Sequence, residues 1–207
     1  MNNARHLLTL LLPLFLCTCG PATEPVTEGA GVDTEADPDL ENPNAGNTDI
    51  YDVDPEDPYL ISNGTFLGLK PGEPLSEYAP TLRPGVVQTG DGDYTVYFID
   101  GAEGDELGYV MRGDYAFDDQ IGNIYVTHPS VVTEQGIRVG TSVKELRERI
   151  GAVTFHGSEI ESRVTGSKDG IGYRLDIPST EYNMDNSTIP LDAQVQMLII
   201  ERPISAQ

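Results

Sequence analysis

The 207-residue sequence predicts an α+β fold of two tandem repeats, each a short helix packed on an antiparallel sheet of about four strands. Two segments match at a fixed offset of 68 residues, and each carries the apolar spacing of an amphipathic helix. Strand-like runs follow each segment. Ahead of them stand an apolar leader and an acidic segment, so we expect a signal peptide at 1–19, a disordered tether at 20–58, and repeats at 59–135 and 136–207.

The first 19 residues have the features of an export signal. One basic residue, Arg5, precedes an apolar run of eleven residues, Leu7–Cys17. A helix needs about 20 residues to span a bilayer, so this run is typical of the core of a signal peptide. A buried core helix fits poorly, because Pro13 interrupts the run and no polar face exists.

The two cysteines of the chain, Cys17 and Cys19, lie at the end of this run, so the exported part has no disulfide and no cysteine chemistry. Residues 16–20 (Leu-Cys-Thr-Cys-Gly) resemble the lipobox of bacterial lipoproteins, although Thr18 stands where a smaller residue is usual. The resemblance implies lipidation of Cys19, with palmitate among its acyl groups, and delivery to the outer membrane of a diderm bacterium. The alternative is cleavage after Ala22, which would give a secreted protein.

Residues 20–58 are predicted to form a disordered tether. They contain twelve acidic residues, no basic ones, and repeated Pro, Gly and Asn, which leaves too little apolar surface for folding. The whole chain has 12 Lys+Arg against 34 Asp+Glu, a net charge of −22. This charge argues against a nucleic-acid partner, because nothing offsets repulsion by phosphates.

The internal match places Gly68–Tyr78 over Gly136–Leu146, with glycines, aliphatic residues and a glutamate coinciding. Pro74 suits the first position of one helix, whereas Ser142 and Glu145 have the spacing of a capping box in the other. Each copy therefore predicts a glycine turn followed by a short helix.

Eight runs of apolar, β-branched and aromatic residues follow the two helices, separated by Gly, Asp and Asn. They are residues 85–88, 94–100, 107–112 and 121–127 in the first copy, and 153–156, 159–165, 171–177 and 194–201 in the second. The segment 178–193 is either a binding loop or a disordered hairpin, and the sequence does not decide between them.

This order of elements resembles the secreted β-lactamase inhibitor protein and the small lipoprotein of the outer-membrane barrel-assembly machinery. The resemblance rests on Gly68–Tyr78, Gly136–Leu146 and the stretch from Ile121 to Gly140, which is also similar to uncharacterised bacterial envelope lipoproteins. Members of such families typically bind other proteins through an exposed sheet face. The resemblance implies no catalytic residue.

A search for catalytic and metal-binding motifs gives no positive result. His128 and His156 lack zinc-site spacing, and no nucleophile motif or phosphate-binding loop is present. Asp91-Gly92-Asp93, Asp118-Asp119 and Asp185 could contribute to calcium binding, but ordinary turn roles explain them better. We therefore expect no enzyme activity, no metal and no cofactor. A hydrolase with a carboxylate site is the alternative, because carboxylates are plentiful.

Tyrosines are abundant in the first repeat, and Tyr97 and Tyr125 are the candidate partner contacts. Alternation along a strand puts Tyr94 and Tyr97 on opposite faces, so at least one points away from the helix. We expect a lipid-anchored, noncatalytic module that binds a protein of the envelope or outer membrane. A purely structural envelope protein is a third possibility, and the sequence identifies no specific partner.

Overall fold

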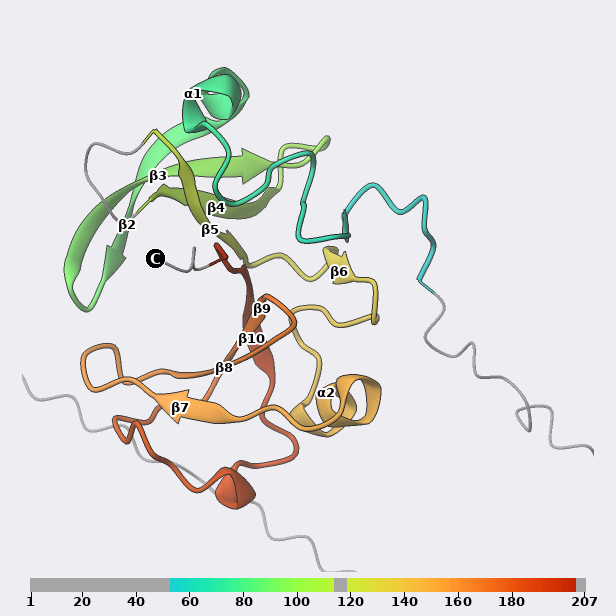
Figure 1. The fold of residues 1–207 in the computed structure, drawn as a ribbon, viewed down its shortest axis with the longest axis vertical. Helices are drawn as coiled ribbons and strands as arrows, with labels where there is room; N and C mark the ends of the chain where they lie inside the picture. Colours follow the sequence, from blue (N-terminus) through green and yellow to red (C-terminus); the bar gives the residue numbers. More distant parts are fainter. Residues whose placement is uncertain (1–52, 114–118, 204–207) are drawn as a thin grey trace, which may run out of the picture. The chain divides into compact units, whose positions relative to one another are not determined.

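The computed structural model describes residues 53–113 and 119–203, all within the compact unit Gly46–Gln207. In this part of the chain, eight strands form one antiparallel sheet in the order β2-β3-β4-β5-β10-β9-β8-β7 (Figure 1). The strands are β2 (Arg83–Thr89), β3 (Gly92–Asp100), β4 (Glu106–Arg112), β5 (Ile121–Val126), β7 (Phe155–Gly157), β8 (Val164–Lys168), β9 (Ile171–Leu175) and β10 (Val195–Ile200). A separate parallel pair joins β1 (Leu60–Ile61) to β6 (Val132–Thr133).

Two short α-helices accompany the sheet in the described residues. Helix α1 (Leu75–Tyr78) has Pro74 as its N-cap and continues into the 3-10 turn η1 (Ala79–Thr81). Helix α2 (Val143–Ile150) begins with the predicted capping box of Ser142 and Glu145 and ends at Gly151. A second 3-10 turn, η2 (Asn186–Thr188), lies in the connection from β9 to β10. No helix in the described ranges is long and apolar enough to cross a bilayer.

Both helices pack on the same face of the sheet, the helix-covered face. Leu75 of α1, and Val143 and Leu146 of α2, belong to one buried cluster with side chains from the central strands. Ile124 and Leu198, from the adjacent strands β5 and β10, are fully buried in it. The main core therefore runs without interruption across the junction between the N-terminal and C-terminal strands.

The predicted fold class, α+β with two tandem helix-and-sheet repeats, is wrong. The protein is mostly β, with one eight-stranded sheet that is continuous through the pairing of β5 with β10. The matched glycines nevertheless share a backbone conformation, since φ is 79° at Gly68 and 75° at Gly136, then 93° at Gly72 and 94° at Gly140. The 68-residue match therefore reflects a shared local turn, and turn geometry does not determine how many sheets the strands form.

Six of the eight predicted strand runs overlap their strands closely; the run 153–156 shares two residues with β7, and one run is displaced. The sequence predicted a strand over 159–165, but β8 occupies Val164–Lys168. The carbonyl oxygen of Ser158 accepts a hydrogen bond from Ser162 N–H at 2.9 Å, so residues 158–162 form a loop. The β8–β9 turn is Asp169-Gly170, with φ of 53° and 79°, as expected for a tight hairpin.

The predicted signal peptide and Cys19 lie outside the described residues, as does the predicted tether up to residue 52. The last residues assigned to the tether, 53–58, form turns next to β1. Asp54 accepts hydrogen bonds from Glu56 N–H and, through its carbonyl, from Asp57 N–H. Asp57 accepts one from Tyr59 N–H at 2.8 Å. These carboxylates therefore hold backbone turns.

Candidate binding surface

A row of large side chains crosses the face of the sheet opposite the helices. Strand register places Phe98, Tyr109 and Tyr125 side by side on β3, β4 and β5. Phe98 meets Tyr109 edge to face at 6.2 Å between ring centroids, and Tyr109 stacks on Tyr125 at 4.9 Å. Arg83 on β2 lies over the Phe98 ring at 4.6 Å, and Ile199 on β10 continues the row beyond Tyr125.

Further apolar side chains flank this row and complete what we call the tyrosine face. Its members share one sheet face and contact one another; they are Val87, Val96, Phe98, Tyr109, Met111, Tyr125, Met197 and Ile199. The Phe98 ring packs against β2 at Gly85, where a Cβ atom would be 2.3 Å from that ring. The tyrosine face thus forms a second apolar cluster to which neither helix contributes.

Two loops approach each other across the tyrosine face (Figure 1). The turn between β2 and β3 contacts the β7–β8 loop, since a Cβ atom on Gly90 would lie 3.3 Å from the carbonyl oxygen of Ile160. Ile160 itself is 70% exposed, and Tyr94, which pairs with Val87 at the edge of the tyrosine face, is 37% exposed. The margin of the tyrosine face therefore presents large apolar side chains to solvent.

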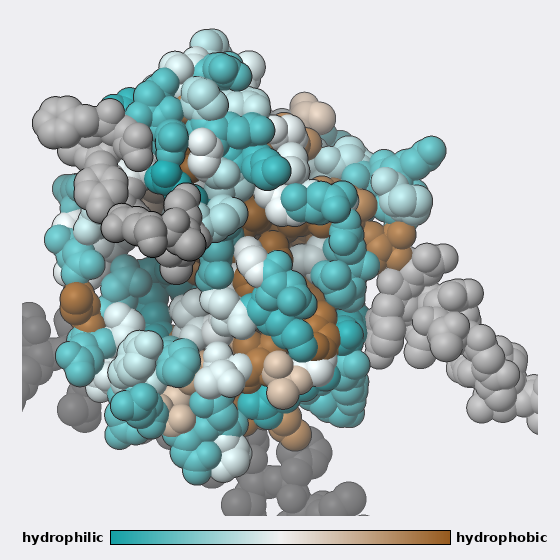
Figure 2. Space-filling model, in the orientation of Figure 1, coloured by the Kyte–Doolittle hydropathy of each residue, from teal (hydrophilic) through white to brown (hydrophobic). Residues whose placement is uncertain are grey.

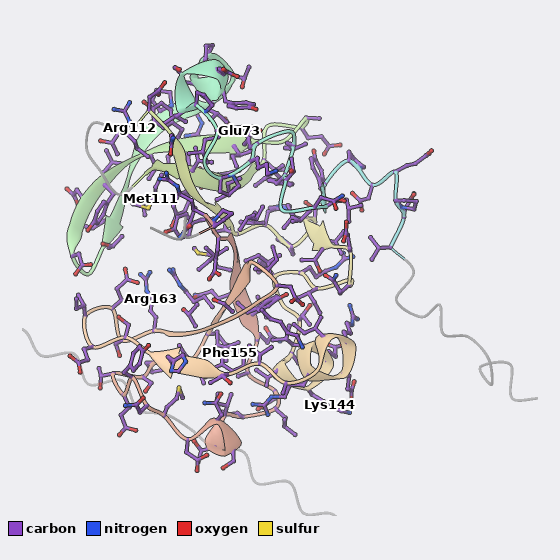
Figure 3. All side chains as sticks on the ribbon, in the orientation of Figure 1. Glu73, Met111, Arg112, Lys144, Phe155 and Arg163 are labelled. Carbon is purple, nitrogen blue, oxygen red and sulfur yellow. The ribbon has the colours of Figure 1, made fainter. Side chains whose placement is uncertain are left out.

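Figure 3 shows the residues around the tyrosine face as sticks. Met111 from β4 and Arg163 from the β7–β8 loop both project into the space between the two arms of the sheet (Figure 3). The space-filling view shows hydrophobic residues gathered from the centre toward the right, in the region of β6 and α2, with hydrophilic ones around them (Figure 2). Polar surface therefore borders the apolar part of this view.

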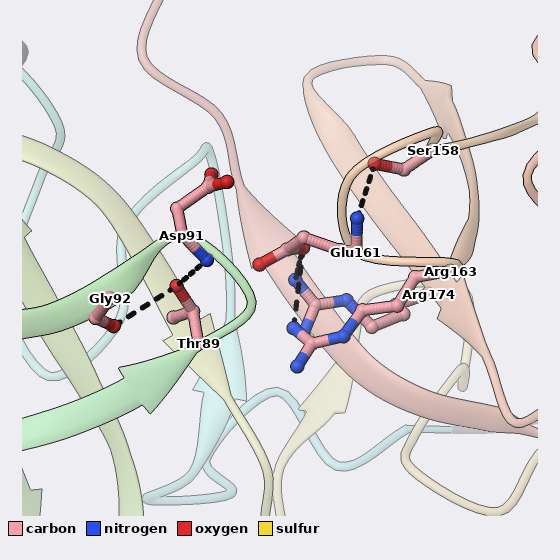
Figure 4. Close-up of polar contacts among 7 residues, drawn as sticks. All are labelled: Thr89, Asp91, Gly92, Ser158, Glu161, Arg163 and Arg174. Carbon is pink, nitrogen blue, oxygen red and sulfur yellow. Dashed lines mark hydrogen bonds and ion pairs between the residues drawn. The ribbon is translucent and has the colours of Figure 1, made fainter.

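A charged cluster lies at the β7–β8 side of the tyrosine face (Figure 4). Arg163 Nη1 is 3.3 Å from Glu161 Oε2, and Arg174 Nη2 is 3.9 Å from the same oxygen. Arg174 stands on β9 opposite Met197, and its side chain is only 11% exposed. The Glu161 N–H donates to Ser158 Oγ at 3.1 Å, which fixes the loop that carries this carboxylate.

The surroundings of Arg174 are unfavourable to its charge. Burial, followed by repulsion from Arg163, lowers the pKa of Arg174, and attraction from Glu161 opposes this change. Burial also raises the pKa of the neighbouring Tyr109 hydroxyl, so that phenol stays neutral at physiological pH. Within the described residues, Arg174 Nε is buried and has no hydrogen-bond partner. The tyrosine face thus holds a guanidinium with unused donor capacity.

The structure separates the two tyrosines named as candidate partner contacts. Tyr125 belongs to the tyrosine face, stacked on Tyr109. Tyr97 lies half-buried on the other side of β3, packed against the main core under the helices. Only Tyr125 therefore lies on the face that the helices leave uncovered.

Sequence reasoning missed the charged cluster. Alternation along β9 could have placed Arg174 opposite the buried positions Ile171 and Tyr173. Arg163 and Glu161 were assigned to a strand, which hid the loop that brings them to Arg174.

Two of the carboxylates considered for calcium, Asp119 and Asp185, have local structural roles. Asp119 accepts hydrogen bonds from the backbone and hydroxyl of Ser76 at the start of α1. Asp185 caps η2, and hydrogen bonds from Ser187 lower the pKa of its carboxyl group. Asp91 lies in the β2–β3 turn, where its N–H donates to Thr89 Oγ1 at 3.2 Å. Asp118 is outside the described residues, which contain no group of three side chains able to hold a metal.

Two surface depressions occur elsewhere on the described part of the chain. One, of about 270 Å³, lies beside α2 and is lined by residues that include Arg138, Thr141 and Glu145. The other, of about 160 Å³, lies beside α1 between Leu69, Tyr78 and Ile99. One polar residue of each depression has a local partner: Glu145 accepts in the α2 cap, and Tyr78 donates to Glu73 at 2.5 Å.

No family model matches this chain. No curated protein matches it either. Among solved structures, the crystal structure of the uncharacterized protein yfeY from Escherichia coli is similar, with 20% identity over 65% of this chain and 93% of that chain. The TM-score is 0.42, which supports no inference about this protein.

Proposed function

We propose that this protein is a noncatalytic protein-binding module of the bacterial cell envelope, anchored to the outer membrane by lipid on Cys19. Its partner is an envelope or outer-membrane protein. The acidic segment after Cys19 would give the folded region reach from its anchor, because a flexible coil of that length extends roughly 35 Å and its charges repel one another.

The tyrosine face is the observation that carries this proposal. Aromatic and sulfur-containing side chains, with arginine beside them, are the residue types enriched in protein interfaces. Here Tyr109 and Met197 are buried, so contact with a partner falls to the half-buried side chains of the face and to Tyr94 and Ile160, which are exposed at its margin. The half-buried aromatic and sulfur-containing side chains are Phe98, Met111 and Tyr125. A partner that packs on the margin would bury Tyr94 and Ile160.

Affinity copurification of the tagged full-length protein from gently solubilised envelopes tests the proposal. We expect one stoichiometric partner, and we expect Ile160→Asp to abolish its recovery, because the substitution places a charge in the apolar margin. Leu191→Asp is the matched control: Leu191 is 54% exposed in the connection between η2 and β10, and its carbonyl accepts from Lys144 N–H at α2. Equal loss with both variants, or no partner with the wild type, would refute the proposal.

A further inference from the structure

We propose that Arg174 and Arg163 form a binding site for a single carboxylate carried on an apolar or aromatic group. The inference goes beyond the proposed function and does not depend on it, since a free carboxylic acid could occupy the site as well as a polypeptide. It rests on three features of the described residues: an imbalance of charge, unused hydrogen-bond donors and an adjacent aromatic surface.

The charge imbalance comes from two arginines that share one carboxylate. Both guanidinium groups approach the same oxygen of Glu161, and only Arg163 is near enough for a weak hydrogen bond, at 3.3 Å. In the described part of the chain, no other carboxylate forms an ion pair with either arginine. The cluster therefore carries one uncompensated positive charge in a protein whose net charge is −22.

The donors point to an acceptor that the described residues do not supply. Arg174 Nε is buried without a hydrogen-bond partner, and its Nη2 is 3.9 Å from Glu161, too far for a hydrogen bond. The Nε and one Nη of a guanidinium together match the two oxygens of a carboxylate. Arg163, with 35% of its side chain exposed, offers an anion its first contact from solvent.

Charge and surroundings favour a carboxylate over a phosphate monoester. One negative charge neutralises the cluster, whereas a dianion would leave excess negative charge beside Glu161 in a largely buried site. Tyr109 and Tyr125 are close enough to Arg174 to influence its charge, and Met197 is its partner on β10. Tyr109 and Met197 are buried, so the half-buried Tyr125 offers the aromatic surface for the body of the ligand.

Titration of the full-length protein with 3-phenylpropionate tests the site, and the readout is the NMR resonance of Arg174 Nε–H. We expect saturable binding that shifts this resonance, and no binding of the neutral isostere 3-phenylpropionamide. Phenyl phosphate should bind more weakly than the acid. A peptide with an internal Phe-Glu pair and blocked termini is titrated in parallel: tighter binding of the free acid identifies a small acid as the ligand, and tighter binding of the peptide identifies a polypeptide.

Three variants separate the site from general effects on the fold. Arg174→Met should weaken binding at least about tenfold, because a buried charge partner is lost. Glu161→Gln should strengthen it roughly threefold or more, because competition for the arginines is removed. Lys144→Met, which removes one positive charge from an exposed position on α2, should leave it unchanged. Equal binding of the amide, preference for phenyl phosphate, or wild-type affinity in Arg174→Met would overturn the inference.

Discussion

At the scale of a single residue, Arg174 is a largely buried charge whose contacts stabilise it less than burial destabilises it. Its side chain is 11% exposed, its closest carboxylate oxygen is 3.9 Å away, and Arg163 repels it. We therefore expect Arg174→Met to raise the free energy of unfolding by about 1 kcal/mol, since apolar replacements of poorly paired buried charges are often neutral or stabilising.

Urea unfolding of the wild type and of Arg174→Met at pH 7 measures this difference. Glu161 keeps Arg163 as its partner in the variant, so no carboxylate is left alone. Lys144→Met is the control and should change stability by less than about 0.5 kcal/mol, because Lys144 forms only an exposed pair with Glu148. A loss of stability in Arg174→Met would mean that this arginine is retained for folding.

Cys19 permits a second test on one residue. We expect Cys19→Ser to abolish incorporation of a palmitate analogue and to move the protein from the membrane fraction to the soluble exported fraction. Cys17→Ser, two positions before Cys19, should change neither. Metabolic labelling and detergent partitioning of both variants measure this. Soluble wild-type protein that begins after Ala22 would instead establish the secreted alternative.

At the scale of elements, α2 shows how one cap stabilises a short helix. Glu145 N–H donates to Ser142 Oγ at 3.2 Å, and the Glu145 carboxylate accepts from Ser142 N–H at 3.1 Å. We expect Ser142→Ala to lower the free energy of unfolding by about 1 kcal/mol. Chemical denaturation checks this, and Lys144→Ala on the same helix should cost less than about 0.5 kcal/mol. Equal effects of the two substitutions would contradict a role for the cap.

The same cap should make stability depend on pH. Hydrogen bonds from the backbone and hydroxyl of Ser142 lower the pKa of Glu145, so its contribution is present above the unfolded value of about 4.3 and is lost as pH falls through the folded value. The stability difference between wild type and Glu145→Gln should therefore shrink as the pH is lowered from 6 to 3. Denaturation at a series of pH values measures it, and a constant difference would refute this assignment.

Much of the element order is predictable from local sequence, because caps, turns and alternation are local. Ser142 and Glu145 located α2, and the run 171–177 located β9. Strand partners depend on distant residues, so the pairing of Ile124 with Ile200 was not predictable. That pairing merges the strands into one sheet.

The candidate surface was predictable only in part for the same reason. Alternation showed that some tyrosines must face away from the helices, and Tyr125 does. It could not show that Tyr97 packs against the main core on the helix-covered face, because the side that a helix covers is set by tertiary packing. The ion pairs of Glu161 depend on a loop whose backbone departs from the strand pattern, with φ of 50° at Ser162.

At the scale of the whole molecule, the sheet is joined at its centre by β5 and β10, and β10 is buried on both faces from Met197 to Ile200. Residues of β10 alternate between the main core, as with Leu198, and the tyrosine face, as with Ile199. Pairing with β5 on one side and β9 on the other satisfies the backbone of β10 on both edges. Without this pairing, β5 would be an exposed edge strand of one half of the sheet and β10 an exposed edge strand of the other.

We therefore expect the eight-stranded sheet to unfold as one cooperative unit. Leu198 is fully buried at the centre and pairs with Val126 and Tyr173, so Leu198→Ala should lower the free energy of unfolding by about 2–5 kcal/mol. Hydrogen exchange should report equal losses of protection at the amides of Val110 on β4 and Tyr173 on β9, although β4 does not pair with β10.

Val86→Ala is the control for this experiment, because Val86 is 61% exposed on the edge strand β2 and should change neither amide. If the two halves were independent units, Leu198→Ala would reduce protection at Tyr173 and leave Val110 as in the wild type. Equal losses at both amides would instead show that burial at the β5–β10 junction couples the unfolding of β4 to that of β9, the strand that carries Arg174. A ligand held by Arg174 would then stabilise the whole sheet by mass action.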